Sequence, residues 1–460
     1  MTSAHPSHPD SGEPDGSLGE LLRLAGPIAL SRLGIMGMGL TDAIVVGQYS
    51  ATELGYHALG WSLTGPVLYG GIGLLIGVQV MTARLIGADR PQDTGAVLRR
   101  GLSYAFWLGV GFTLALLLIG DWALHHVGLE ESLADGGGAA LKVFALSITF
   151  YMLSDTLLFW FEAHGKPEKG TIAMWAANVV NLVLNLWMVP GHSPFGIDGA
   201  IASGWATFGA RLSLLLFLLA FLISWDRSRP YGAYARAPRD PPAEREQRRI
   251  GYASGASFLI EGGSFSGLNI LAGWLGTLVV AAWAVTLNVA GIVFMIPLGL
   301  AGATSVLVAR GIGARSIVAV RRAFRLGLLV TAAVLVLLSL GVWFDPALIA
   351  RAYGSDPALI ALAAPALLLS CLFFLADGLQ VVGANALRAR GDVWWPTRMH
   401  FISYIVVMWP IAYGLAIPLG MGLNGIVWGV IIASLVSATA LIWRFYALGE
   451  RLPEKAGDVH

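Results

Sequence analysis

Four acidic residues lie inside long apolar stretches of this chain. Asp42 ends one such stretch, Glu261 stands in Leu-Ile-Glu-Gly-Gly, and Asp377 stands in Leu-Ala-Asp-Gly. Asp155 lies in Leu-Ser-Asp-Thr-Leu, which resembles the string around Asp377 in the second half of the chain. Carboxylates in such surroundings either take up a proton or bind a metal cation. We interpret them as cation-coupling candidates, with Na⁺ or H⁺ as the coupling ion at Glu261, Asp377 or Asp42; the alternative is that each carboxylate satisfies nearby backbone groups.

Cations that would neutralise these acids are scarce in the same stretches. Arg32 and Arg211 are the clearest examples, and neither has an obvious partner in the sequence. The sequence suggests two roles for Arg211: its side chain extends toward the membrane surface, or it pairs with one of the acids.

A stripe of asparagines accompanies the acids. Asn178, Asn181 and Asn185 are spaced by three and four positions, which places them on one face of a helix. Their carbonyl oxygens are suitable ligands for Na⁺ and suitable partners for a carboxylic acid. Interhelical hydrogen bonding that holds a bundle together is the alternative.

Aromatic side chains and one methionine are candidates for a cavity that binds a flat, apolar cation. For any one of them, packing against neighbouring helices or lipid is the alternative. The candidates are Trp61, Tyr69, Trp205, Phe265, Trp274, Trp283 and Met295.

The composition defines the class of protein. Of 460 residues, 56% are hydrophobic and 12% are charged, whereas soluble domains carry roughly 25% charged residues. There is no basic patch with interleaved aromatic residues, so we expect no nucleic-acid partner. One cysteine, Cys371, excludes a disulfide framework. The sequence contains no Walker A string, so ATP is not expected to drive this chain directly. It contains no HExxH or GxSxG string, so a hydrolase or metalloenzyme is poorly supported, and no cofactor is expected.

The sequence repeats itself at a fixed offset. Ala-Arg-Leu-Ile-Gly-Ala at 83–88 returns as Ala-Arg-Gly-Ile-Gly-Ala at 309–314. The same shift, which we call the repeat offset, carries Gly65 onto Gly291 and Gly165 onto Gly391. Two homologous halves in a membrane suggest a transporter, because two lobes can rock about a central site.

The apolar stretches predict an all-α integral membrane protein with twelve transmembrane helices in two pseudo-symmetric bundles of six. The predicted spans are 20–46, 54–84, 95–119, 138–161, 168–190, 197–224, 250–278, 281–309, 318–342, 356–388, 393–417 and 423–446. Arg and Lys concentrate in alternate connections, so both termini are expected in the cytoplasm.

These spans divide the chain into two lobes. The N-lobe is predicted at 18–224 and the C-lobe at 250–448. A Pro- and Arg-rich cytoplasmic linker at 225–249 joins them. Polar tails are predicted at 1–17, where no cleavable signal is evident, and at 449–460.

The chain resembles the multidrug and toxic compound extrusion (MATE) family, in its NorM-type branch, from about residue 18 to residue 448. In the first half the resemblance is carried by Thr-Asp-Ala at 41–43 with Gly47, by Pro66, by Gly-Ala at 87–88, by Asn181 and Asn185, and by Asp-Gly-Ala-Ile-Ala-Ser at 198–203. In the second half it is carried by Glu261 and by Asp-Gly-Leu-Gln-Val-Val at 377–382, continuing to Leu-Arg at 387–388.

The resemblance implies a V-shaped pair of six-helix bundles that exports organic cations in exchange for Na⁺ or H⁺. Asp42 matches the family's N-lobe acid, while Glu261 and Asp377 match its C-lobe acids. The positions around the N-lobe acid that bind the cation or carry its hydrogen bonds are matched by Asn181, Asn185 and Ser203. Phe373 departs from the pattern, since some relatives have Tyr there.

Two other functions are alternatives. A lipid-linked oligosaccharide flippase of the same superfamily typically has further spans and a more cationic cavity. An integral membrane enzyme would need a nucleophile or metal set that the sequence does not show. We therefore expect a cation-coupled drug antiporter, acting as a monomer in the bilayer of a bacterial inner (plasma) membrane, with small organic cations as its substrates.

Overall fold

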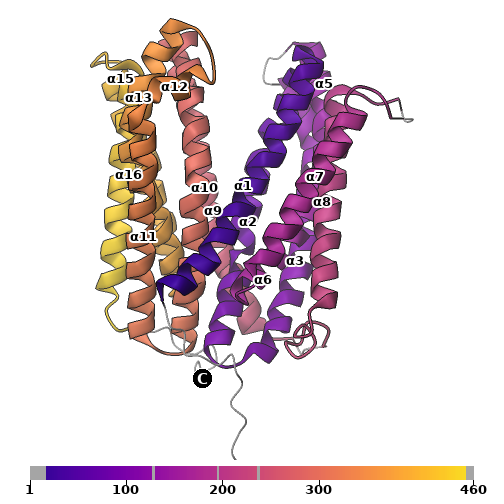
Figure 1. Ribbon diagram of the computed structural model, residues 1–460, viewed down its shortest axis with the longest axis vertical. Helices are drawn as coiled ribbons and strands as arrows, with labels where there is room; N and C mark the ends of the chain where they lie inside the picture. Colours follow the sequence, from indigo (N-terminus) through magenta and orange to yellow (C-terminus); the bar gives the residue numbers. More distant parts are fainter. Residues whose placement is uncertain (1–16, 127–129, 194–195, 236–238, 452–460) are drawn as a thin grey trace, which may run out of the picture.

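The computed structural model describes residues 17–126, 130–193, 196–235 and 239–451, and every regular element in these ranges is a helix (Figure 1). This confirms the predicted all-α class. The elements of the first half are α1 (Leu18–Tyr49), α2 (Ala51–Gly87), the 3₁₀ turn η1 (Pro91–Asp93), α3 (Thr94–Ala115), the π-helical η2 (Leu116–Gly120), α4 (Asp121–His126), α5 (Glu131–Leu146), α6 (Ile148–Ala163), α7 (Pro167–Met188) and α8 (Gly199–Ser224). Those of the second half are α9 (Pro241–Leu275), α10 (Thr277–Gly313), α11 (Ile317–Phe344), α12 (Pro346–Arg351), α13 (Pro357–Ala389), α14 (Trp394–His400), the π-helical η3 (Phe401–Val407), α15 (Met408–Ala416) and α16 (Gly422–Ala447).

The two halves form two lobes that are joined at one end and spread apart at the other (Figure 1). We call these the convergent end, where α1 begins and α16 ends, and the divergent end. Contacts of α1 with α10 and of α2 with α9 join the lobes. One hydrophobic core is continuous across this junction, since it includes Leu24 and Ile28 of α1 together with Leu300 and Leu307 of α10. A second large core belongs to the C-lobe alone.

The backbone repeats with the sequence. Gly165 and Gly391, which are related by the repeat offset, both have a left-handed conformation, with φ of 72° and 92°. Each closes the C-terminal turn of a helix, α6 or α13. Asp89 and Arg315, which the same offset relates, are the two non-glycine residues with positive φ in the described ranges, at 57° and 54°. The offset therefore reflects two structural copies of one unit.

The spans differ from the predicted ones in detail. Eleven helical segments of the described residues are long and apolar enough to cross a membrane. A twelfth long helix, α9, has 35 residues. It is less apolar than the other eleven segments because of its Gly, Ser and charged residues. Its N-terminal turn begins at Pro241, where Asp240 accepts a hydrogen bond from the Ala243 amide (3.1 Å), so it starts inside the segment predicted as the linker. The predicted tails lie outside the described residues except for Ser17 and residues 449–451.

Three predicted spans are not single α-helices. The span predicted at 138–161 is formed by α5 and α6, which break at Ser147. The span predicted at 95–119 ends in η2, and the span at 393–417 contains η3. A π-helical turn shifts the register of the side chains that follow, and such turns are frequent at functional sites. Tyr404 lies within η3.

Candidate functional site

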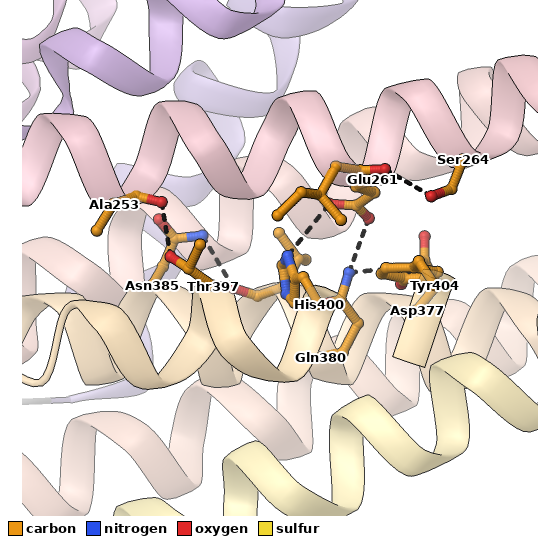
Figure 2. A network of polar contacts seen from close by, with 11 residues as sticks. Ala253, Glu261, Ser264, Asp377, Gln380, Asn385, Thr397, His400 and Tyr404 are labelled. Atoms are coloured by element: carbon orange, nitrogen blue, oxygen red, sulfur yellow. Dashed lines mark hydrogen bonds and ion pairs between the residues drawn. The ribbon is translucent and has the colours of Figure 1, made fainter. Parts of the chain in front are cut away.

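The C-lobe acids lie together and share one partner (Figure 2). Glu261 projects from α9 and Asp377 from α13, and both are buried, with 8% and 5% of their surface exposed. The Gln380 amide, one turn after Asp377, donates to Glu261 Oε1 (3.0 Å) and to Asp377 Oδ1 (3.2 Å). A single amide therefore bridges two carboxylates from different helices, so a change of charge on one acid reaches the other directly.

Two further side chains complete this cluster, and the sequence did not single them out for it. The Tyr404 hydroxyl, from η3, donates to Asp377 Oδ1 (3.2 Å), and His400 Nδ1 lies 3.9 Å from Glu261 Oε2. Both side chains are buried. Phe373 packs against Phe265, with ring centroids 5.9 Å apart, and offers no hydroxyl. Tyr404 thus brings a phenol to Asp377 from another helix. Nothing in the apolar run at 401–407 except the tyrosine itself would have indicated this.

The N-lobe acid has a separate set of partners. Asp42 Oδ1 accepts from the Asn181 amide (2.9 Å) and from the Asn185 amide (2.7 Å), and Asp42 Oδ2 accepts from the Thr207 hydroxyl (2.6 Å). All four side chains are at most 2% exposed. Helices α1, α7 and α8 therefore converge on this carboxylate. The two asparagines were identifiable from their spacing, whereas Thr207, one turn after Ser203 on α8, was not predicted.

The N-lobe cluster also holds oxygens without partners. Asn181 Oδ1, Asn185 Oδ1 and Ser203 Oγ are buried and accept no hydrogen bond from the described residues. Unpaired buried oxygens are costly, and a hard cation such as Na⁺ would satisfy them together with the carboxylate. No cluster of three or more His, Cys, Asp or Glu side chains suited to a metal occurs among the described residues, so a cation here would have mixed carboxylate, amide and hydroxyl ligands.

A cavity of about 300 Å³ lies between the lobes. Its walls are mainly apolar and aromatic, and Glu261 and Asp377 both line it. Of the residues predicted for a cavity, Tyr69, Phe265 and Met295 also belong to its wall. The lining also includes the polar side chains of Arg32 and Gln79 from the N-lobe and of Asn385 from the C-lobe. The cavity therefore has an acidic side in the C-lobe.

Four other aromatic candidates lie away from this cavity. Trp61 packs edge-on against Phe144 and lies 5.7 Å from the Arg211 guanidinium. Trp205 packs against Phe208, and Trp274, which is 63% exposed, packs against Tyr413. Trp283 is buried in the C-lobe core. The sequence alone did not distinguish these packing positions from the cavity wall.

Asn178 is also separate from the acid that its neighbours contact. Its amide donates to the Gly34 carbonyl (3.0 Å) and to the Met174 carbonyl (2.9 Å). A β-carbon added at Gly34 would lie 3.4 Å from the Asn178 amide nitrogen and closer still to the Met174 side chain. Asn178 thus fastens α7 to α1, in keeping with the interhelical alternative for this stripe.

Arg32 and Arg211, the two arginines inside predicted spans, both have partners in the structure. Arg32 pairs with Glu162 of α6 (3.0 Å), and Gln79 donates to the same carboxylate (2.6 Å). Glu162 was not predicted as a partner because it directly follows the predicted span 138–161. Arg211 donates to Ser147 Oγ (2.6 Å), so it braces the break between α5 and α6. Asp155 is fully buried, and neither of its carboxylate oxygens has a hydrogen-bond partner among the described side chains.

The arrangement of helices, acids and cavity defines a class of protein. It is a multi-pass membrane protein of two repeated bundles, with buried acids in each bundle and a cavity between them. The pattern of the MatE family matches residues 27–187 and again residues 253–414, so each repeat carries one copy. The chain belongs to the MatE family.

Individual proteins agree with this assignment. The chain is 50% identical over 432 residues to "Probable multidrug resistance protein NorM" of Caulobacter vibrioides, with 94% of this chain and 92% of that protein covered. It is 30% identical to the protein of the same name from Bradyrhizobium diazoefficiens, with 98% of each chain covered. Its fold is similar to the outward-facing conformation of a multidrug resistance MATE family transporter of the MOP superfamily, with a TM-score of 0.86, 18% identity, and 96% of this chain and 98% of that chain covered.

Proposed function

We propose that this protein exports organic cations across a bacterial inner membrane, in exchange for Na⁺ or H⁺, by alternating access. The observation that carries the proposal is the cavity between the lobes, whose apolar and aromatic wall is closed on one side by Glu261 and Asp377. Such a wall suits a flat amphipathic molecule, and the acids suit its positive charge. The names of the two bacterial relatives support multidrug export.

The same acids supply a route for coupling. A carboxylate attracts a cationic drug, whereas a protonated or Na⁺-bound carboxylate does not. A cationic drug therefore favours the charged carboxylates, whereas a bound Na⁺ or proton neutralises them. Binding of either ligand weakens the affinity for the other by the same factor. The Gln380 amide connects both acids, so occupancy by one ion acts on the pair.

The Asp42 cluster is proposed as a second binding site for the coupling ion. It lies in the other lobe and has three donors fixed on the carboxylate, with three further oxygens unpaired. Its position on α1 connects it to the junction between lobes, because α1 packs against α10. An ion bound there would act on a helix that both lobes contact.

A lipid-linked oligosaccharide flippase is the second function to be tested. The cavity argues against it, since its one arginine, Arg32, is already paired with Glu162 and its other charged groups are acids. A phosphate-bearing lipid would meet repulsion there.

The deciding experiment uses purified protein in proteoliposomes loaded with ethidium. Sodium and proton gradients are imposed separately, and efflux is followed by fluorescence. We expect an inward gradient of at least one of the two ions to accelerate efflux above the rate measured without an ion gradient. Liposomes containing the Glu261→Gln/Asp377→Asn variant serve as the matched control. An efflux rate that does not change with either gradient would contradict the proposal, and so would transport of a fluorescent lipid-linked glycan in place of ethidium.

A further inference from the structure

Arg310, near the end of α10 in the C-lobe, reaches into the N-lobe at the convergent end. Its guanidinium donates to the Ala163 carbonyl at the C-terminus of α6 (2.8 Å) and pairs with Glu20 in the first turn of α1 (3.0 Å). The side chains of the pair are 13% and 15% exposed. One arginine of the C-lobe thus holds two helix ends of the N-lobe.

Arg84, near the end of α2 in the N-lobe, makes the reciprocal contacts. Its guanidinium donates to the Ala389 carbonyl at the C-terminus of α13 (2.8 Å) and lies 3.6 Å from Glu246 in the N-terminal part of α9. The side chains are 16% and 22% exposed. One arginine of the N-lobe thus holds two helix ends of the C-lobe.

The two sets of contacts are copies of each other. The repeat offset carries Arg84, Glu20 and Ala163 onto their counterparts Arg310, Glu246 and Ala389. All three residue types are identical between the copies, and each arginine contacts the lobe opposite its own. Cationic side chains at the C-terminal carbonyls of helices are also favoured by the helix dipole.

Two glycines allow this approach. A β-carbon added at Gly87 would overlap the carbonyl oxygen of Arg310, and one added at Gly313 would overlap the carbonyl oxygen of Arg84. The ends of α2 and α10 therefore touch through backbone atoms, in two contacts that the repeat offset again relates. This close contact fixes the distance at which the arginines can reach across.

We propose that these residues form a paired latch that closes the convergent end between transport steps. The latch consists of Arg84 with Glu246 and the Ala389 carbonyl, and of Arg310 with Glu20 and the Ala163 carbonyl. Access from the convergent side requires the lobes to part there, which breaks both halves of the latch. Because these charge-assisted contacts join the lobes only when that end is closed, they favour the closed arrangement over its opposite. The inference rests on the alternating access of the proposed function.

The latch is tested by distances between spin labels, measured without drug or ion gradient. One label pair, at Glu168 and Val318, reports on the convergent end, and a second, at Glu131 and Phe344, reports on the divergent end; all four positions are exposed in the structure. Cys371→Ser removes the background thiol. Because neither coupling nor export is measured, failure of the latch is distinguishable from failure of the proposed function.

The test variant is Arg84→Gln/Arg310→Gln. Hydrogen bonds that involve charged groups contribute about 1.5–3 kcal/mol, so losing one half of the latch should lower the ratio of closed to open molecules roughly tenfold and losing both roughly a hundredfold. Even a wild-type population that is about 99% closed would then become an even mixture. We expect a longer distance at 168/318 and a shorter one at 131/344. Arg322→Gln removes an exposed arginine of α11 and should leave both distances unchanged. Wild-type distances in the double variant would overturn the proposal.

A second variant tests the latch without altering charge. Gly313→Ala inserts a methyl group where α10 touches the Arg84 carbonyl, whereas Gly273→Ala, the matched control, inserts one where no atom lies within 4 Å. We expect the 168/318 distance to lengthen in the first and not in the second. This result would sustain the latch if the double arginine variant proved too unstable to purify. Equal distances in both glycine variants would refute it.

Discussion

The bridge between Glu261 and Asp377 makes a quantitative prediction about drug binding. Because one Gln380 amide contacts both carboxylates, the two acids should act as a unit. In the wild-type protein the affinity for a cationic drug should weaken as Na⁺ rises or as pH falls. Coupling free energies of this kind are typically about 1–3 kcal/mol, which corresponds to a change in Kd of roughly 5–150-fold.

Neutralising either acid should remove most of that dependence. In Asp377→Asn or Glu261→Gln the Kd should change less than about threefold over the same range of Na⁺ and pH. In the double variant the Kd should depend on Na⁺ and pH as weakly as in the single variants, because the effects of mutations at residues that interact do not add. Kd would be measured by quenching of ethidium or by calorimetry in detergent. Asp135→Asn, which removes a carboxylate that is 68% exposed, is the matched control and should keep the full dependence. Full dependence in both single variants, or losses that simply add in the double variant, would refute the reasoning.

Three further predictions concern other parts of the site and the topology. Asp42→Asn should bind drug but fail to concentrate it against a gradient, because the ion-binding site in α1 is lost while the cavity is intact; accumulation at the wild-type level in vesicles would make Asp42 structural. Tyr404→Phe should strengthen proton binding at Asp377 by roughly tenfold, since it removes a hydrogen bond to the charged carboxylate that contributes about 1.5–3 kcal/mol, and should leave the thermal midpoint within a few degrees; an unchanged pH dependence of drug binding would exclude this role. In a Cys371→Ser background, a cysteine at Arg245 should react with an impermeant thiol reagent only after cells are opened, and one at Glu131 should react in intact cells; the reverse pattern would invert the topology.

The fold was largely predictable because its determinants are local in sequence. The length of an apolar stretch identifies a membrane helix, and the repeat offset in the sequence identifies two copies of one unit. The errors were also local. Ser147 breaks a predicted single span, and the π-helical turn at 401–407 has no distinct composition. Helix α9, by contrast, was predicted as the span 250–278, although its Gly, Ser and charged residues give it a lower mean hydropathy than the other long helices.

The acids of the site and the two asparagines that contact Asp42 were predictable, but the other partners of the acids were not. A carboxylate in an apolar run is costly, so Asp42, Glu261 and Asp377 stood out individually. Their contacts with Thr207 and Tyr404 depend on how separate helices cross, and a threonine or tyrosine in an apolar run is ordinary by itself. Trp61 shows the opposite failure, since an aromatic side chain on a helix has the same sequence signature whether it lines a cavity or packs against an arginine.

The central claim is that drug and ion exchange for one another, and it is tested most directly by driving the ion with the drug. Proteoliposomes are loaded with a cationic drug and diluted into drug-free medium without any ion gradient, and uptake of radioactive Na⁺ or of protons is recorded. The exchange mechanism predicts that drug leaving the vesicles draws the coupling ion inward, and that Glu261→Gln/Asp377→Asn abolishes this uptake. Drug efflux in the wild-type protein without movement of either ion would contradict it.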